Sequence, residues 1–384
     1  MTVYLDHAAT TPMLPEAVAA LTGQLTFTGN PSSLHASGRQ ARRTVEESRE
    51  RIAAVLNCRP GEVVFTSGGT ESDNLAIKGL YWARGRRRIL STAVEHHAVL
   101  DALHWLGEDE GAEVELLPVD AQGRLVVSAL AEAIARDPAS VGLVSVMWAN
   151  NEVGTLQPID EVVALAAAHG IPVHTDAVQA VGSVPVDFGA SGVDALTLTG
   201  HKLGGPYGVG ALIVRRELEL TPLIHGGGQE RDVRSGTIDT PAIAGLAAAV
   251  EVSVKQQADT AVRIGVLRDE LERRVLEVAP DARSSGDIAH RLPGHAHLQF
   301  PGCEGDSLLM LLDAAGIECS TGSACNAGVP EASHVLLAMG CTDDEARSSL
   351  RFTLGHTSTA ADVDALVAAL PAAVERARLA RGLT

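Results

Sequence analysis

The chain has 384 residues, and at roughly 150 residues per domain this length predicts two or three domains. Hydrophobic residues make up 46% and charged residues 20%, which is typical of a globular enzyme and excludes a disordered chain. Acidic residues (48) outnumber basic residues (30), and the net charge of −18 argues against direct nucleic-acid binding over a broad surface. No apolar run approaches the ~18 residues of a membrane span, and no signal peptide is visible. Five cysteines in so long a chain favour free thiols in a reducing cytoplasm.

Short apolar runs of strand type alternate with helical patterns over much of the chain. The predicted strands are Glu62–Thr66, Arg88–Thr92, Glu113–Val119, Val141–Trp148, Ile171–Thr175, Val193–Thr199 and Val209–Val214. The predicted helices include Gln40–Leu56, Glu71–Trp82, Ile159–Ala168, Ala242–Gln257 and Val262–Val278. This alternation predicts an α/β fold with a mostly parallel sheet covered by helices on both faces. We interpret the basic run Arg84–Arg88 as the solvated start of a strand rather than as a binding patch.

The residue pattern changes after Pro241, where Ala-rich helical stretches lead into a region with fewer strand signals. We therefore expect a domain boundary near residue 258, inside or at the end of a long helix. Residues 15–258 are expected to form a large domain. Residues 1–14 and 259–384 are expected to form a smaller α+β domain.

Polar residues directly follow five of the predicted strands. They are Ser67–Ser72, Glu95–His97, Asn150–Glu152, Asp176 with Gln179, and Gly200–Lys202. Ligands of open parallel sheets bind beyond the carboxyl ends of the strands. Five polar loops in succession therefore predict one crowded site.

The first of these loops, Ser67-Gly68-Gly69-Thr70, joins a strand to a helix. Its glycine backbone and the free N–H groups of a helix start are suited to a phosphate, whereas a capped helix with acidic residues in its first turn explains the pattern equally well. The loop is neither a Walker A sequence nor G-x-G-x-x-G, which argues against a nucleoside triphosphate or a Rossmann dinucleotide.

Asp176 and Lys202 lie at the ends of consecutive predicted strands. Pyridoxal phosphate requires this combination, because a lysine binds its aldehyde as a Schiff base and a carboxylate keeps its ring nitrogen protonated. A buried Asp–Lys ion pair is the alternative. The glycines around Lys202 favour the cofactor, because they indicate an accessible loop rather than a packed core.

Two further candidates are less constrained by the sequence. One of the adjacent histidines His96 and His97 is placed to lie over a cofactor ring or to transfer protons, and His97 is interpreted as a surface residue. No metal site is expected, because metal-ligand spacings such as C-x-x-C and H-E-x-x-H are absent. Cys325, among small residues and glycines, is a candidate nucleophile, with a buried structural cysteine as the alternative.

Taken together, the sequence resembles the NifS-like and IscS-like cysteine desulfurases of the class V aminotransferases, which have the fold of type I pyridoxal phosphate enzymes. The resemblance rests on Tyr4–Pro12, Gly29–His35, Thr66–Asn74, Glu95–Leu100, Asn150–Gly154, His174–Gln179, Gly200–Lys202, Arg234–Thr237, Gly322–Cys325 and Ser349–Phe352. These stretches run in order over nearly the whole chain.

The resemblance implies a role for each matching residue. Lys202 would be the Schiff-base lysine and would move the Cα proton, and His96 would stack on the cofactor ring and transfer protons. The other implied cofactor ligands are Asp176 at the ring nitrogen, Gln179 and Asn151 near the ring hydroxyl, Gly69, Thr70, Thr199 and His201 at the phosphate, and Thr237 from a second subunit. Arg351 with Asn30 would bind the substrate carboxylate, and Cys325 would accept the sulfur.

The implied reaction converts L-cysteine to L-alanine and leaves a persulfide on Cys325 for delivery to an acceptor protein. Iron–sulfur cluster assembly is the expected use, with RNA or DNA thiolation left open. The chain ends at Thr384, without the longer tail with which some relatives bind an iron–sulfur scaffold, so the acceptor stays open. A homodimer is also implied. The alternatives are another pyridoxal phosphate enzyme, such as an aminotransferase or a selenocysteine lyase, and a scaffold protein without activity.

Overall fold

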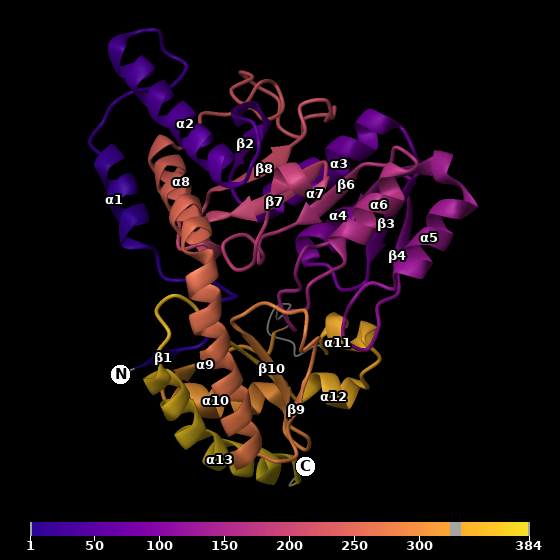
Figure 1. Ribbon diagram of the computed structural model, residues 1–384, viewed down its shortest axis with the longest axis vertical. Coiled ribbons are helices and arrows are strands. Elements are labelled where there is room, and N and C mark those ends of the chain that lie inside the picture. Colours follow the sequence, from indigo (N-terminus) through magenta and orange to yellow (C-terminus); the bar gives the residue numbers. More distant parts are fainter. Residues whose placement is uncertain (1, 323–331, 383–384) are drawn as a thin grey trace.

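The computed structural model describes residues 2–322 and 332–382. The molecule has a larger upper part built around a central sheet and a smaller lower part that contains both ends of the described chain (Figure 1). The upper part is an α/β structure and the lower part is α+β, as the sequence predicts. Cys325 lies outside the described residues.

A seven-stranded sheet forms the centre of the upper part, in the order β2-β8-β7-β6-β5-β3-β4. Its strands are β2 (Val63–Thr66), β3 (Arg88–Thr92), β4 (Glu113–Leu117), β5 (Val141–Ser145), β6 (Val173–Asp176), β7 (Ala195–Thr199) and β8 (Gly210–Val214). Only β8 runs antiparallel to its neighbours, so the sheet is mostly parallel. Each strand overlaps a predicted one.

Helices cover both faces of this sheet because its strands are apolar on both sides. Along β2, Val63 and Phe65 belong to one hydrophobic cluster with α2 and α8, whereas Val64 belongs to a cluster with α3. The helices of the upper part are α1 (Pro15–Gln24), α2 (Ala36–Val55), α3 (Gly69–Arg84), α4 (His97–Asp109), α5 (Val127–Arg136), α6 (Ile159–Ala167), α7 (Phe188–Ser191) and α8 (Thr240–Lys255), with the 3₁₀ turns η1 (Pro60–Glu62), η2 (Pro138–Ser140) and η3 (Gly200–Lys202).

The lower part contains a three-stranded antiparallel sheet and a two-stranded parallel sheet. The strands are β1 (Val3–Tyr4), β9 (Arg283–Ser284), β10 (His295–Gln299), β11 (Ile317–Glu318) and β12 (Ser349–Thr353). The helices are α9 (Gln257–Val278), α10 (Gly305–Ala314), α11 (His334–Ala338), α12 (Asp343–Arg347) and α13 (Ala360–Gly382). A separate hydrophobic cluster forms its core and includes Val3 and Leu5 from the start of the chain.

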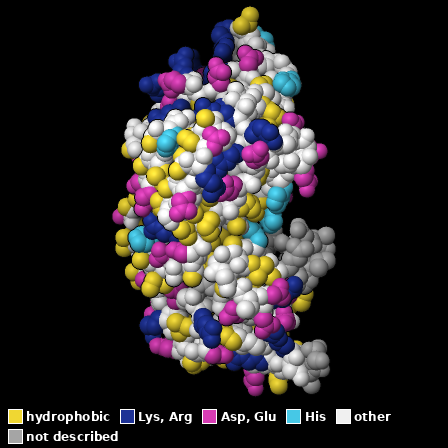
Figure 2. Space-filling model, turned by 90° about the vertical axis from the view of Figure 1, so that its right-hand side faces the viewer, with side chains coloured by type: hydrophobic (Ala, Val, Ile, Leu, Met, Phe, Trp, Pro, Cys, Tyr) yellow, Lys and Arg dark blue, Asp and Glu magenta, His cyan; other side chains and the backbone are white. Residues whose placement is uncertain are grey.

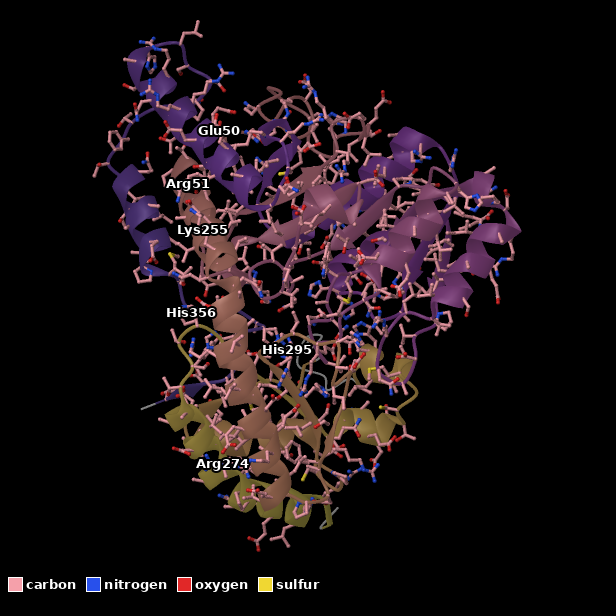
Figure 3. All side chains as sticks on the ribbon, viewed as in Figure 1. Glu50, Arg51, Lys255, Arg274, His295 and His356 are labelled. Atoms are coloured by element: carbon pink, nitrogen blue, oxygen red, sulfur yellow. The ribbon has the colours of Figure 1, made fainter. Side chains whose placement is uncertain are left out.

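Helices α8 and α9 connect the two parts, with Gln256 alone between them. Figure 3 shows Arg51 of α2 and Lys255 of α8 on neighbouring helices, and Glu251 pairs with both, at 2.6 Å from Arg51 and 2.5 Å from Lys255. The cores of the two parts are separate hydrophobic clusters, with Val3 and Leu5 in the lower one and Leu14 in the upper one, and the division at residue 258 stays a prediction.

The basic run at residues 84–88 lies at the start of β3, and its arginines contact the protein itself. Arg88 pairs with Glu115 at 2.9 Å, Arg87 pairs with Glu113 at 3.1 Å, and Arg86 donates to the carbonyl of Val141. Within residues 2–322 and 332–382, no helix is both long enough and apolar enough to cross a membrane.

Candidate active site

The five polar loops that follow the strands converge on one cavity of about 360 Å³ between the upper and lower parts. Figure 2 shows histidine side chains beside the hollow in the outline of this face. The cavity is lined by ten of the residues with a role expected from the sequence: Gly69, Thr70, His96, Asn151, Asp176, Gln179, Thr199, His201, Lys202 and Arg351. The structure therefore brings residues of all five loops together at one cavity.

One end of the cavity has the features of a phosphate cradle. Gly68 has a φ of +151°, which residues with a side chain rarely adopt, and it precedes the free N–H groups of the 16-residue helix α3. A Cβ added to Gly69 would lie 3.1 Å from a methyl group of Val178, and that side chain would have to move by a few tenths of an ångström to make room. Glycine fits here without this adjustment. The buried Nδ1 of His201 has no hydrogen-bond partner among the described residues, and an anion here would supply one.

The competing explanation of this loop is present only in part, because α3 has an acidic residue in its first turn but no side chain caps its start at Gly68. Glu71 in the first turn of α3 accepts from the Ser67 N–H at 2.8 Å and pairs with Arg234 at 2.7 Å. The carboxylate of Glu71 therefore stabilises the loop, while the N–H groups of Gly69 and Thr70 remain beside the cavity.

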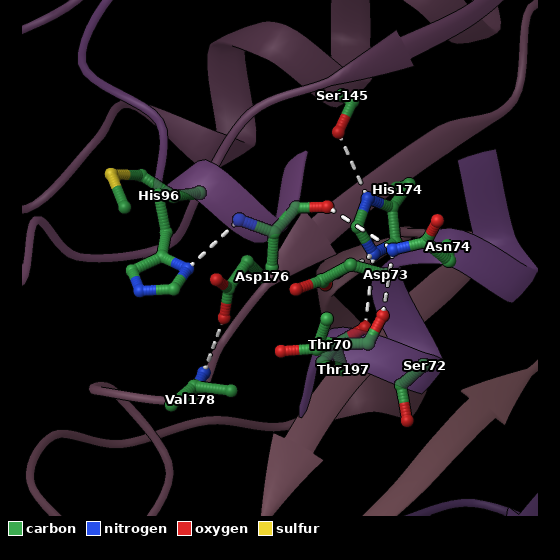
Figure 4. Close-up of polar contacts among 12 residues, drawn as sticks. Thr70, Ser72, Asp73, Asn74, His96, Ser145, His174, Asp176, Val178 and Thr197 are labelled. Atoms are coloured by element: carbon green, nitrogen blue, oxygen red, sulfur yellow. Dashed lines mark hydrogen bonds and ion pairs between the residues drawn. The ribbon is translucent and has the colours of Figure 1, made fainter. Parts of the chain in front are cut away.

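Asp176 and Lys202 both line the cavity and form no direct ion pair in the described structure, which argues against the alternative of a structural Asp–Lys bridge. The carboxylate of Asp176 accepts from the Val178 N–H at 2.9 Å, and burial raises its pKa to about 6 (Figure 4). The amine of Lys202 donates to the carbonyl oxygens of Ala8 and Ala9, the latter at 2.8 Å. Burial and the nearby charge of Arg351 lower the pKa of Lys202 to about 8, so that a neutral, nucleophilic amine is accessible near neutral pH.

Two more buried carboxyl groups lie beneath this site. Asp73 and Glu95 are at most 1% exposed, and burial raises the pKa of Glu95 to about 8 and that of Asp73 well above its usual range. Asp73 lies 3.5 Å from the imidazole of His174, which burial keeps neutral and which also contacts Ser145 at 2.9 Å (Figure 4). At neutral pH the buried Glu95 is therefore mostly protonated, and Asp176 ionises more readily than Glu95.

Only one ring nitrogen of His96 forms a hydrogen bond within the described structure. Its Nδ1 accepts from the Ala98 N–H at 3.1 Å and caps α4, so the neutral ring carries its proton on Nε2. Burial and the charge of Lys202 lower the pKa of His96 to about 4. The neighbouring His97 contacts the ring of His334 at 5.0 Å between centroids and pairs with Asp101.

Arg351 comes from strand β12 of the lower part and closes the opposite side of the cavity. Its Nη2 pairs with Asp6 at 2.8 Å, its Nη1 donates to the carbonyl of Asn151 at 2.8 Å, and its Nε is buried without a partner in the described structure. The guanidinium is therefore held at both terminal nitrogens, and because it carries five N–H donors, donors remain for a small carboxylate.

Two predicted residues lie elsewhere. Asn30 and Thr237 line a separate cavity of about 920 Å³ near the starts of α2 and α8, and neither borders the cavity of Lys202 in this chain. Thr237 was expected to act across a subunit boundary, and its position is compatible with that expectation. The described residues contain no group of three His, Cys, Asp or Glu side chains arranged to hold a metal ion.

The chemistry of the cavity fits pyridoxal phosphate. It combines an anion cradle with an unpartnered histidine nitrogen, a carboxyl group at a strand end, and a lysine with a lowered pKa. These are the groups that the phosphate, the ring nitrogen and the aldehyde of this cofactor require.

Comparison with known proteins identifies the class of enzyme. Residues 3–366 match the aminotransferase class-V family. The chain is 57% identical to the IscS-like cysteine desulfurase of Mycobacterium tuberculosis over 98% of this chain and 97% of that protein. The structure superimposes on the NifS-like protein of Rickettsia africae with a TM-score of 0.89 and 33% identity, over 98% of this chain and 100% of that one. A structure of SspA in complex with cysteine gives a TM-score of 0.81 and 35% identity, over 93% of this chain and 100% of that one.

The chain therefore belongs to the cysteine desulfurases of the aminotransferase class-V family, whose cofactor is pyridoxal phosphate. This confirms the resemblance drawn from the sequence, together with the enzyme class and the cofactor.

Several residues that border or support the site were not recognised from the sequence pattern. Asp73 and His174 lie inside recognised stretches, but only the docking of α3 on β6 shows that they are buried beneath the cavity. The carbonyls of Ala8 and Ala9 leave no signal in the sequence, because backbone oxygens are common to all residues. Asp6 carried a usable signal, since it is an acidic residue directly after an apolar run.

Proposed function

We propose that this cysteine desulfurase converts L-cysteine to L-alanine and passes the sulfur to Cys325 as a persulfide. The Cβ–S bond of the substrate breaks and a proton replaces sulfur on Cβ, while a new S–S bond forms at the thiolate of Cys325. The substrate carbon is reduced and the transferred sulfur is oxidised, so no further oxidant is needed. The observation that carries the proposal is that Lys202, Asp176, His96 and Arg351 line one cavity.

Each wall of the cavity would hold a different part of the cofactor. We assign the phosphate to Gly69, Thr70, Thr199 and His201, the ring nitrogen to Asp176, the ring hydroxyl to Gln179 and Asn151, and the aldehyde to Lys202. When bound, pyridoxal phosphate withdraws electrons from Cα and so weakens the Cβ–S bond.

Two side chains would move protons in the reaction. The amine of Lys202, with its pKa lowered to about 8, is suited to take the Cα proton after it is released from the cofactor. His96 presents Nε2–H to the cavity, because its Nδ1 is occupied by the backbone of α4, and it is therefore suited to donate a proton.

Arg351 would bind the carboxylate of the substrate. The free Nε–H on a guanidinium that is otherwise fixed by Asp6 and the carbonyl of Asn151 supports this role. A role for Asn30 at the carboxylate, and for Thr237 at the phosphate, would need a second subunit, since both line a different cavity. We accordingly propose a homodimer.

We further propose that the chain works in the cytoplasm and delivers its sulfur to an acceptor protein, either an iron–sulfur scaffold or a thiolation enzyme. None of the four described cysteines would compete with Cys325 as a nucleophile, because burial raises the pKa of each thiol. The pKa values of Cys58 and Cys319 are raised to about 12.

The test measures alanine and persulfide together. With L-cysteine as substrate, the wild type is expected to release alanine and to carry one labelled sulfur on Cys325, and Cys325→Ala is expected to lose both. Cys319→Ala serves as the matched control and is expected to retain both. Lys202→Ala is expected to lose the absorbance of the lysine-bound cofactor. Full alanine and sulfide production by Cys325→Ala would refute the proposed sulfur transfer.

A further inference from the structure

The N-terminal segment Asp6–Thr11 crosses from the lower part of the molecule to the upper part directly along the cavity. At its start, the backbone N–H of Ala8 donates to the Oγ1 of Thr353 in β12 at 2.8 Å. At its end, the N–H of Thr11 donates to the carbonyl of His201 at 3.0 Å. The segment thus connects the strand that carries Arg351 with the loop that carries Lys202.

Within this segment, Asp6 contacts Arg351 through its side chain. Its carboxylate lies 2.8 Å from Nη2 of Arg351, and its side chain is 20% exposed against 5% for Arg351. The backbone of Asp6 is itself held, because its carbonyl accepts from the hydroxyl of Tyr4 at 3.1 Å. The carboxylate is therefore presented to Arg351 from a fixed position.

The guanidinium of Arg351 is held from two sides. Nη2 pairs with the carboxylate of Asp6, and Nη1 donates to the carbonyl of Asn151. Nε is buried and has no partner in the described part of the chain. A planar guanidinium held at both terminal nitrogens has little freedom to rotate about its stem. Its remaining donors, here called the free edge, are then held in a fixed direction, and Arg351 borders the cavity.

We propose that Asp6 is a positioning residue that orients Arg351 so that its free edge receives the carboxylate of the amino-acid substrate. The proposal rests on the role of Arg351 given under the proposed function. Asp6 itself does not touch the substrate. Its contribution to binding is made through Arg351, and it is confined to substrates that carry a carboxylate.

Asp6 also acts on Lys202, and the test must separate the two effects. The negative charge of Asp6 raises the pKa of Lys202, against the larger lowering effects of burial and Arg351. Replacing Asp6 by a neutral residue therefore lowers the pKa of Lys202 further. This second effect changes the binding of any primary amine, with or without a carboxylate.

The experiment compares L-cysteine with cysteamine, which lacks only the carboxylate. Binding of each to the holoenzyme is followed by the initial change in cofactor absorbance, for wild type, Asp6→Asn, Asp6→Ala and Arg351→Gln. The ratio of the two dissociation constants measures how much the carboxylate contributes to binding. Glu318→Gln is the matched control, because it removes an exposed negative charge from the strand beside Tyr4 and has no contact with Arg351 in the described structure.

Asp6→Ala is expected to reduce the preference for L-cysteine over cysteamine by roughly tenfold or more, the usual effect of losing a hydrogen bond between charged groups. Asp6→Asn is expected to lie between Asp6→Ala and the wild type, and Glu318→Gln is expected to leave the preference unchanged. An equal loss for both ligands, or a stronger preference in Asp6→Ala because Asp6 competes with the substrate for Arg351, would overturn the proposal.

Arg351→Gln separates this inference from the proposed function. If Arg351→Gln abolishes the preference while Asp6→Ala retains it, the positioning role is wrong and the role of Arg351 stands. If Arg351→Gln retains the preference, Arg351 does not bind the carboxylate and both proposals fail. Circular dichroism and the absorbance of the bound cofactor report on each variant's fold, and Asp6→Asn, which keeps the shape of the side chain, provides the comparison if Asp6→Ala unfolds.

Discussion

Replacing Glu95 by Gln is expected to flatten the dependence of stability on pH. Glu95 is fully buried, and burial raises its pKa from 4.5 to about 8, although Thr92 and the Met147 N–H donate to its carboxyl group. Because the pKa is raised in the folded state, the folded protein keeps a proton that the unfolded chain releases. The contribution to stability is therefore complete below about pH 4.5 and is lost as the pH rises toward 8.

The size of the effect follows from this shift. Over the range in which only the folded state holds the proton, the free energy of unfolding falls by up to about 1.4 kcal/mol per pH unit. Between pH 5 and 7.5 the wild type is thus expected to lose about 3 kcal/mol relative to Glu95→Gln, whose amide stays neutral. Asp73 and Asp176, which line the cavity, are present in both proteins, and the difference includes their electrostatic interaction with Glu95.

The assay is urea unfolding of the cofactor-free protein, followed by circular dichroism at intervals between pH 5 and 8. Thr92→Val provides a second measurement, because removing the hydroxyl that donates to Glu95 at 2.7 Å raises the pKa further and moves the loss of stability to higher pH. A difference between wild type and Glu95→Gln that stays constant across this range would refute the reasoning, since it would mean that Glu95 does not exchange its proton there.

Two further outcomes are expected. The cofactor-free enzyme should recover its lysine-bound absorbance close to tenfold faster at pH 7 than at pH 6 and reach a plateau above pH 8, because the pKa of Lys202 is lowered to about 8 and only its neutral amine reacts. A stopped-flow rate that does not change with pH would contradict this. Glu230→Ala should lower the free energy of unfolding by about 3–5 kcal/mol, since it removes the carboxylate 2.8 Å from the buried guanidinium of Arg49 and leaves it, among the described carboxylates, only the half-exposed Glu46 at 3.3 Å. The double variant Arg49→Met, Glu230→Leu should recover much of that loss in a denaturation experiment, and a single variant as stable as the wild type would show that the pair contributes nothing.

The strands of the upper sheet could be predicted because they are short apolar runs between turn residues. The strand β5 is shorter than predicted, ending at Ser145 rather than at Trp148. The reason is that Met147 leaves the ladder and donates its N–H to Glu95 at the edge of the cavity. Strands β1, β9 and β11, with two residues each, carry too little pattern to be recognised.

The residues that line the cavity could be predicted because they follow strands of a parallel sheet, where the topology brings loops together. Contacts between distant segments could not be predicted in the same way. Asp6 and Arg351 are 345 residues apart, and nothing in either stretch indicates that they meet. The placement of Asn30 and Thr237 in another cavity likewise depends on the packing of α2 beside α8.

The pairing of β1 with β11 has a consequence for the synthesis of the protein. A chain made from its N-terminus exposes Val3 and Leu5 first, yet their partners in the lower core, such as Ile317 and Phe352, are added near the end. The central sheet can form while these first residues remain without partners. Because the carbonyl oxygens of Ala8 and Ala9 accept from the amine of Lys202, this lysine reaches its final surroundings only when the last strand has been made. A nascent or truncated chain that lacks β12 should therefore have a folded upper part but no enzymatic activity.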